Sequence, residues 1–174
     1  MARPSLSDLS DLTSGPETCG EIDIRIARDG SWFYHGSPIT RKPLVKLFAS
    51  VLRRNSDGAY WLVTPAERVR IRVDDAPFVA VALDAEGKGR AARLTFTTNV
   101  DDTVTAGSNN PIRVAFHAAT REPSPYVRVR DGLEALISRP VYYELVALGE
   151  THGASFGVWS DGAFFALGEA PCAS

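Results

Sequence analysis

Residues 22–36 constrain the fold more than any other part of the sequence. Isoleucines alternate with polar residues from position 22 to position 26, which is the pattern of a strand that buries one face. Asp29-Gly30 follows, and this dipeptide favours the positive φ angles of a tight hairpin turn. The aromatic residues at 32–34 then form the return strand. The sequence therefore predicts an antiparallel hairpin close to the amino terminus, followed by a helix.

One long helix is predicted after this hairpin. Pro43 fits the first helical turn, because proline lacks the N–H group that such a position leaves unpaired. Apolar residues then recur along one face of the helix, at Leu44, Leu47, Phe48, Val51 and Leu52. Arg53 and Arg54 favour the carboxyl end of a helix, where their charges complement its dipole. Strands are expected next at 60–63, 69–73 and 78–83.

The second half of the sequence resembles the first in its plan. Alternating residues at 94–98 match those at 22–26, and 126–131 match 69–74. Pro140 stands where Pro77 stands in the first half, and each proline is expected to begin an apolar strand. A short helix at 133–138 is expected only in the second half.

These patterns predict an α+β fold of mainly antiparallel sheets, built from hairpins and one long helix, with a two-fold internal structural repeat. We expect an amino-terminal arm at 1–18, a first α/β unit at 19–86 and a second, β-rich unit at 91–174. The glycine-containing segment 86–90 is the expected linker.

Charge and cysteine content limit the functional class. A formal net charge of −2 disfavours a dedicated nucleic-acid-binding protein. No apolar run is long enough to span a bilayer, and the amino terminus lacks the apolar core of a secretion signal. Cys19 and Cys172 lie near opposite ends of the sequence, which suits free thiols in a reducing compartment. We therefore expect a cytoplasmic protein.

The sequence does not predict a catalytic or metal centre. Residues 153–157 match the G-x-S-x-G pattern of serine hydrolases, but no histidine follows Ser155 to complete a triad. The three histidines have no ligand companion at metal-binding spacing, so neither a metal nor a cofactor is expected.

Candidate ligand-binding residues gather around the entrance to the long helix. The free N–H groups and the dipole of a helix start favour anions, and cationic and hydroxyl side chains precede this helix. Arginines on one face of the strand at 69–73 could add bidentate contacts to a carboxylate or phosphate. The candidate site residues are Tyr34, His35, Ser37, Arg41, Lys42, Arg70 and Arg72.

Residues 22–39 resemble DUF1285, a bacterial family of unknown function. The resemblance continues through 41–49, 62–65, 74–80 and 139–145. It rests most specifically on Trp32, Tyr34, His35, Gly36, Arg41 and Pro43. The resemblance implies a cytosolic bacterial protein with repeated α/β motifs, no established catalytic activity, and a ligand-binding or signalling role.

The expected function is therefore non-enzymatic binding of a small anionic ligand or of a partner protein, with a regulatory role. A homodimer that forms through exposed hairpin edges is the expected assembly. One alternative is a small hydrolase or isomerase that uses His35 with a carboxylate such as Asp23 or Asp75. A further alternative is nucleic-acid binding through the row formed by Arg68, Arg70 and Arg72, which the net charge disfavours.

Overall fold

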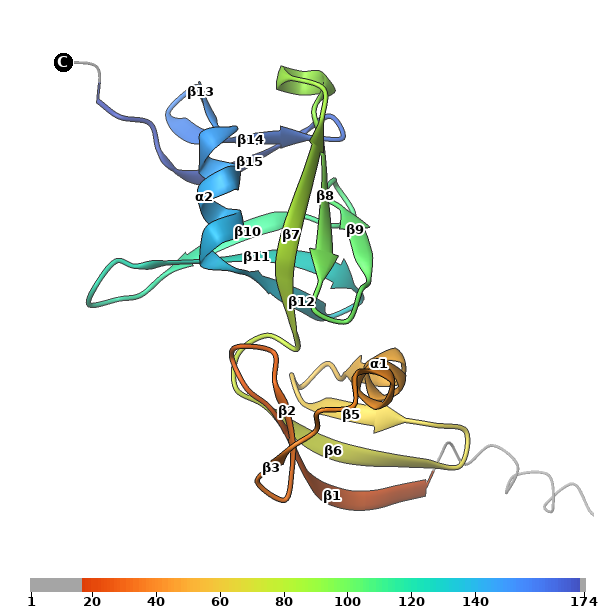
Figure 1. The fold of residues 1–174 in the computed structure, drawn as a ribbon. Coiled ribbons are helices and arrows are strands. Elements are labelled where there is room, and N and C mark those ends of the chain that lie inside the picture. Colours follow the sequence, from red (N-terminus) through yellow and green to blue (C-terminus); the bar gives the residue numbers. More distant parts are fainter. Residues whose placement is uncertain (1–16, 173–174) are drawn as a thin grey trace, which may run out of the picture.

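The computed structural model describes residues 17–172, which form two six-stranded sheets, one three-stranded sheet and two α-helices (Figure 1). Most of the expected arm, residues 1–16, lies outside the described residues, whereas residues 17 and 18 already belong to the first strand. None of the helices within 17–172 has the length and apolar character that a membrane crossing requires.

The first sheet has the strand order β3-β2-β1-β6-β5-β4. Its two central strands, β1 and β6, are parallel, and every other pair is antiparallel. The elements of this unit are β1 (Glu17–Ile26), β2 (Trp32–Tyr34), β3 (Ser37–Pro38), α1 (Lys42–Ser50), β4 (Leu52–Arg54), β5 (Tyr60–Val63) and β6 (Glu67–Val73).

The second sheet has the strand order β10-β11-β12-β7-β8-β9, again with a parallel pair, β12 and β7, at its centre. In both sheets the chain runs from the centre to one edge and returns from the other edge to the centre. This shared order favours the expected internal repeat. The strands are β7 (Phe78–Glu86), β8 (Arg93–Thr98), β9 (Thr103–Thr105), β10 (Ile112–Phe116), β11 (Pro123–Arg130) and β12 (Leu133–Ile137).

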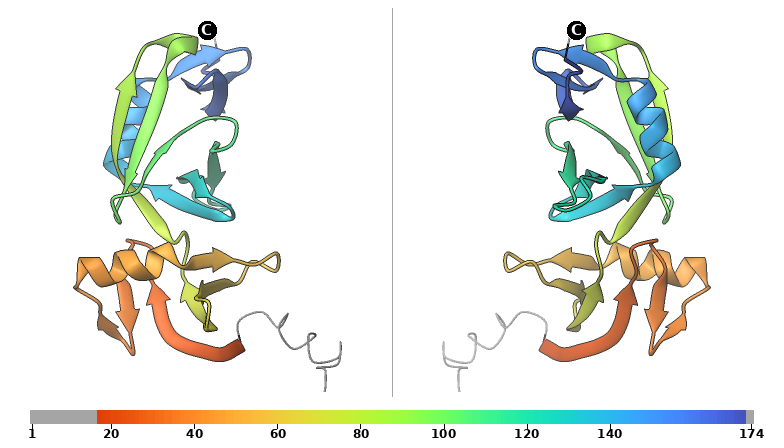
Figure 2. Two further views of the ribbon diagram at one scale, coloured as in Figure 1. Left: turned by 90° about the vertical axis from the view of Figure 1, so that its right-hand side faces the viewer. Right: turned by 90° about the vertical axis from the view of Figure 1, so that its left-hand side faces the viewer.

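A smaller antiparallel sheet and the second α-helix complete the second unit. Figures 1 and 2 show these elements and the second sheet on one side of the molecule, and the first sheet with α1 on the other. A short 3-10 helix, η2 (Gly89–Ala91), stands between β7 and β8. The remaining elements are α2 (Arg139–Ala147), β13 (Glu150–His152), β14 (Ser155–Ser160) and β15 (Ala163–Glu169).

The α+β class and the predominance of antiparallel pairing are confirmed, but the single long helix is wrong. Both α-helices have nine residues. Helix α1 ends at Ser50, and the two arginines expected at its carboxyl end lie in β4, where Leu52 is fully buried and pairs with Leu62. Pairing with β5 therefore overrides the continuation of the helix.

The expected structures around Pro140 are also wrong. Residues 133–137 form strand β12, because alternate side chains along it are buried. Pro140 then occupies the first turn of α2, and the side chains of Val141 and Leu145, four residues apart, are both buried. The expected strand is thus a helix, and the expected helix is a strand.

The boundary between the two sheets also differs from the expected one. Strand β7, which we assigned to the first unit, pairs with β8 and β12 of the second sheet. Gly87 and Gly89 have positive φ angles and belong to the connection between β7 and β8 rather than to a linker. The chain changes sheets between Val73 and Phe78.

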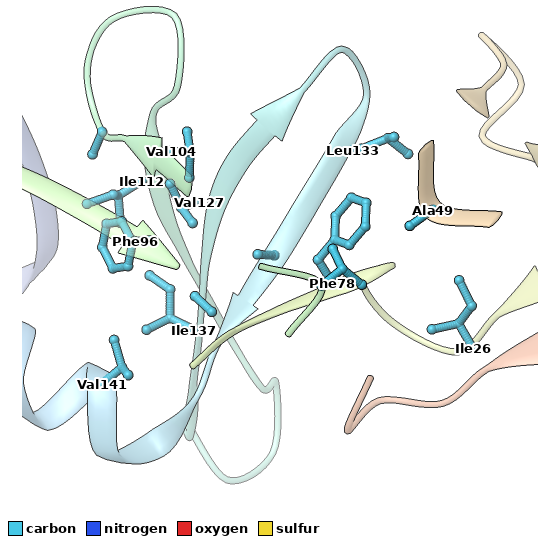
Figure 3. Packing of buried hydrophobic residues seen from close by; sticks show 14 of the residues in the cluster. Ile26, Ala49, Phe78, Phe96, Val104, Ile112, Val127, Leu133, Ile137 and Val141 are labelled. Carbon is cyan, nitrogen blue, oxygen red and sulfur yellow. The ribbon is translucent and has the colours of Figure 1, made fainter. Parts of the chain in front are cut away.

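One apolar core runs through both units. Ile26 of β1 and Ala49 of α1 belong to the same cluster of buried side chains as Leu133 of β12. Figure 3 shows Phe78 at the junction, beside both Leu133 of the second unit and Ala49 of the first. The Phe78 side chain is fully buried, so it connects the packing of the two units.

Candidate functional site

The largest described cavity, of about 640 Å³, lies where the turn after β1 meets the beginning of α2. Arg28 comes from the first unit, and the other lining residues come from the segment 122–143 of the second. The cavity is therefore built by both units. Its polar lining consists of Arg28, Glu122, Ser124, Ser138, Arg139, Tyr142 and Tyr143.

The turn after β1 positions Arg28. The Ala27 N–H donates to the Ser31 carbonyl, and Gly30 adopts a φ of 87°, which closes the turn and leaves Arg28 on its outer side. Of the expected Asp29-Gly30 pair, only Gly30 has a positive φ. Packing around Gly30 is close, since a Cβ atom there would lie 2.6 Å from the Asn99 side chain of the second unit.

The Arg28 side chain reaches across to the second unit. Its Nη2 donates to Ser124 Oγ at 3.1 Å, and its Nε lies 3.3 Å from Asp75 Oδ2. Asp75 also accepts a hydrogen bond from the Tyr126 hydroxyl at 2.7 Å. Two partners thus orient the guanidinium group at the edge of the cavity.

Burial and the hydrogen bond to Asp75 raise the pKa of Tyr126 to about 12. In an unfolded chain tyrosine titrates near pH 10, so the folded state holds this proton more tightly. Its contribution to stability is complete below about pH 10 and is lost as the pH rises towards about 12.

Between about pH 10 and pH 12, the melting temperature (Tm) of the variant Tyr126→Phe is therefore expected to fall less than that of the wild type. Its Tm at pH 7 should be lower than that of the wild type, because a hydrogen bond to a carboxylate is worth about 1.5–3 kcal/mol. Thermal unfolding followed by circular dichroism from pH 7 to pH 12 measures both effects. Tyr143→Phe, at an exposed position, is the control that should keep the wild-type slope. Equal slopes in Tyr126→Phe and the wild type would contradict the role of this hydroxyl.

Helix α2 supplies the second cation of the cavity. Arg139 is its first residue, and its Nη2 lies 2.8 Å from Glu122 Oε1. Ser138 precedes the helix and makes no side-chain capping hydrogen bond, so its hydroxyl remains available to a ligand. The start of α2 also carries the positive end of the helix dipole. This side of the cavity therefore favours negative charge.

The remaining wall of the cavity is largely apolar. It is formed by Pro123, Pro125, Leu136 and Ile137, and the Tyr142 ring belongs to the same lining. Burial raises the pKa of Tyr142 further above the neutral range. Its hydroxyl, which like any tyrosine hydroxyl is protonated at neutral pH, can donate a hydrogen bond. The cavity lining thus combines apolar side chains with cationic and hydroxyl groups.

The residues predicted from the sequence lie outside this cavity. His35 and Gly36 have positive φ angles and form the two-residue turn between β2 and β3, with Tyr34 and Ser37 as the flanking pair. All four residues are exposed. The expected helix entry at His35 is therefore a second hairpin turn, of the kind that favours positive φ at both central positions.

The structure brings some of these residues together around Asp23. His35 Nδ1 lies 3.5 Å from Asp23 Oδ2, and Arg72 Nη2 donates to Asp23 Oδ1 at 2.9 Å. The Tyr34 and His35 rings are 4.2 Å apart. Asp75, the other carboxylate considered for His35, instead binds Arg28 and Tyr126.

The basic residues at the start of α1 lie elsewhere. Arg41 is the exposed residue that precedes α1. Lys42 and Lys46 both contact Asp101 of the second unit, at 3.0 and 3.3 Å. These ion pairs hold α1 against the turn between β8 and β9, so part of the positive charge at the helix entrance is used between the units.

The arginines of β6 share the outer face of the first sheet, since Ile71 between them is buried. Arg68 stacks over the Trp61 ring at 4.2 Å, and Arg72 binds Asp23. Arg70 is exposed and is paired in register with Glu21 of β1. Within this row, Arg72 thus has a carboxylate partner and Arg68 an aromatic one.

Sequence reasoning missed Arg28, Ser138, Arg139 and Tyr142 as site residues. One signal was available: Ser138-Arg139-Pro140 has a capping residue followed by a proline, which is typical of a helix start. No comparable signal marks Arg28, because its role depends on contacts with residues about a hundred positions later.

Comparisons with known proteins agree with this architecture. The model of the DUF1285 N-terminal domain, a domain of unknown function, matches residues 13–76, and that of the DUF1285 C-terminal domain matches 77–167. The division between them falls where the chain passes from the first sheet to the second. No curated protein matches the chain.

Two solved structures are similar to this chain. A DUF1285 family protein from Silicibacter pomeroyi DSS-3 is 53% identical, with a TM-score of 0.86, over 95% of this chain and 88% of that one. A DUF1285 family protein from Shewanella baltica OS155 is 29% identical, with a TM-score of 0.56, over 71% of this chain and 90% of that one. With both domain models matched in order, the chain belongs to the DUF1285 family.

Proposed function

We propose that this protein is a non-enzymatic binding protein for a small organic anion, which occupies the cavity between the turn after β1 and the start of α2. The observation that carries the proposal is that Arg28 and Arg139, from different units, line the same cavity. Guanidinium groups bind carboxylates and phosphates through paired hydrogen bonds. A volume of about 640 Å³ lies within the range of cavities that enclose small organic ligands.

A regulatory role is consistent with this position. Arg28 is the contribution of the first unit to the cavity, so a ligand that binds Arg28 and Arg139 together favours the arrangement in which the two units are docked. Ligand concentration would then change the surface that the docked units present to a partner protein.

The enzymatic alternative has weaker support. His35 and Asp23 are close enough to interact, but both side chains are largely exposed on a hairpin outside the largest cavity. Such a position does not exclude water from a reacting group. Nucleic-acid binding through the β6 arginines is disfavoured by the ion pair between Arg72 and Asp23 and by the net negative charge of the protein.

The proposal is tested with 2-naphthoate, a fluorescent aromatic carboxylate. Arg28→Ala and Arg139→Ala are each expected to weaken its binding about tenfold or more, because a hydrogen bond to a charged group is worth about 1.5–3 kcal/mol. Fluorescence titration gives the Kd values. Both side chains are mostly exposed, so the variants should keep the wild-type Tm.

The matched controls are Arg41→Ala and Arg70→Ala, which remove exposed arginines of the site predicted from the sequence. They should leave the Kd unchanged. Weaker binding in the controls, together with wild-type binding in Arg28→Ala and Arg139→Ala, would move the anion site to the residues predicted from the sequence. If the wild type binds none of several naphthalene anions, the proposed function itself is contradicted.

A further inference from the structure

Each arginine of the cavity already has a carboxylate partner. Arg28 Nε lies 3.3 Å from Asp75 Oδ2, and Arg139 Nη2 lies 2.8 Å from Glu122 Oε1. The formal charges of these groups cancel. Within the cavity lining itself, Glu122 is the acidic residue and stands beside the guanidinium group that a ligand would approach.

This balance limits the charge of a ligand. A single negative charge can share a guanidinium hydrogen bond with Glu122 or Asp75, because each arginine has several N–H donors. A second negative charge would find no net positive charge in the site and would be repelled by Glu122. A dianion would also lose a more strongly bound hydration shell on entering the cavity. The site therefore favours a monoanion over a dianion of the same shape.

The apolar wall limits the rest of the ligand. Pro123 and Pro125 of β11 and Leu136 of β12 line the cavity together with Tyr142 of α2. Proline rings and tyrosine rings present flat apolar surfaces, against which a planar ring packs with a large contact area. Tyr143, whose side chain is largely exposed, adds a second tyrosine ring to the lining.

We infer that the ligand is an aromatic monoanion, that is, a planar ring that carries one carboxylate or one phosphodiester group. The inference rests on the proposed function, since it names the ligand class of the same cavity. The acid group would lie between Arg28 and Arg139, and the ring would lie against Tyr142. Glu122 is then the residue that determines specificity for charge.

The test compares probes that share the naphthalene ring system and differ in charge. Methyl 2-naphthyl phosphate carries one negative charge at pH 8, and 2-naphthyl phosphate carries two, because the second phosphate pKa is about 6. The diester is expected to bind about threefold more tightly than the dianion. The uncharged 2-naphthol should bind more weakly than either. A higher affinity for 2-naphthoate than for the diester would identify a carboxylate ligand, and the reverse a phosphodiester; both support the inference.

The variant Glu122→Gln tests whether Glu122 causes the preference for the monoanion over the dianion. It keeps the shape of the side chain and removes its charge, so the dianion should gain about fivefold in affinity and the diester less, which removes the preference. The control is Glu144→Gln on the exposed side of α2, outside the cavity lining, which should keep the wild-type preference.

The outcomes separate this inference from the proposed function. If the dianion binds more tightly than the diester in the wild type, and Arg28→Ala and Arg139→Ala weaken both, the inference is overturned and the anion site stands. An unchanged preference in Glu122→Gln would also overturn it. Binding of no probe, or binding that is indifferent to both arginines, would overturn the proposed function as well.

Discussion

Replacing Phe78 with alanine is expected to lower the free energy of unfolding by about 3–5 kcal/mol, the usual cost of truncating a fully buried phenylalanine. Phe78 begins β7 at the junction of the two units, and its side chain has no exposed surface. Its ring lies beside both Leu133 and Ala49, and the guanidinium carbon of Arg130 is 5.4 Å from the ring centroid. The space left by the ring cannot close unless both units move, so little of the loss should be recovered.

Urea denaturation followed by circular dichroism measures this effect. The control is Val81→Ala on the same strand, where the valine side chain is 50% exposed. It should change the free energy of unfolding by no more than about 0.5 kcal/mol. A loss below about 1 kcal/mol in Phe78→Ala would mean that the ring does not carry the packing between the units.

Gly157→Ala is expected to destabilise the protein by about 3 kcal/mol, at the upper end of the cost of overpacking. Gly157 is buried in β14 and pairs with Ala166 of β15. A Cβ atom at this position would overlap the carbonyl oxygen of Phe165 and lie 2.9 Å from the Ala166 Cα. These are backbone atoms, so the two strands would have to separate and expose Val158 and Phe165.

Gly168→Ala on the neighbouring strand is the matched control. A Cβ atom there has no neighbour within 4 Å, so the variant should keep the Tm of the wild type within about 2 °C. Differential scanning calorimetry of the two variants gives the comparison. Equal melting temperatures for Gly157→Ala and the wild type would show that the β14–β15 pair can shift without cost.

Local sequence patterns predict the class of this fold but not its division into units. The alternating isoleucines of β1, the turn at Gly30 and the proline-initiated helix α1 follow from spacing alone. The helix after Ser138 does not follow from spacing alone, because a short apolar run fits both a strand and a helix. Its state is decided by packing of Val141 and Leu145 against the rest of the second unit.

The expected repeat was aligned on the wrong strands. Sequence similarity paired residues 126–131 with 69–74, that is, β11 with β6. The strand order makes β12 the counterpart of β6, and β7 the counterpart of β1. Short alternating segments resemble one another wherever they occur, so position in the sheet, rather than sequence, identifies equivalent strands.

The candidate site depended on contacts that local patterns do not encode. The helix entrance at Lys42 has the residues of an anion site, but Asp101 from the second unit binds the Lys42 and Lys46 ammonium groups. Conversely, Arg28 looks like an ordinary turn residue until Asp75 and Ser124 orient it. Both differences come from the way the two units dock.

Three of the four edge strands of the two large sheets are short. The first sheet has ten residues in β1 but two in β3 and three in β4, and the second has nine in β7 but three in β9. A second molecule that added itself to β3, β4 or β9 would gain a ladder of only two or three residues. These three edges should therefore resist ribbon-like growth at high concentration, whereas β10, with five residues, and β15, with seven, are longer edge strands. Association into a homodimer stays a prediction.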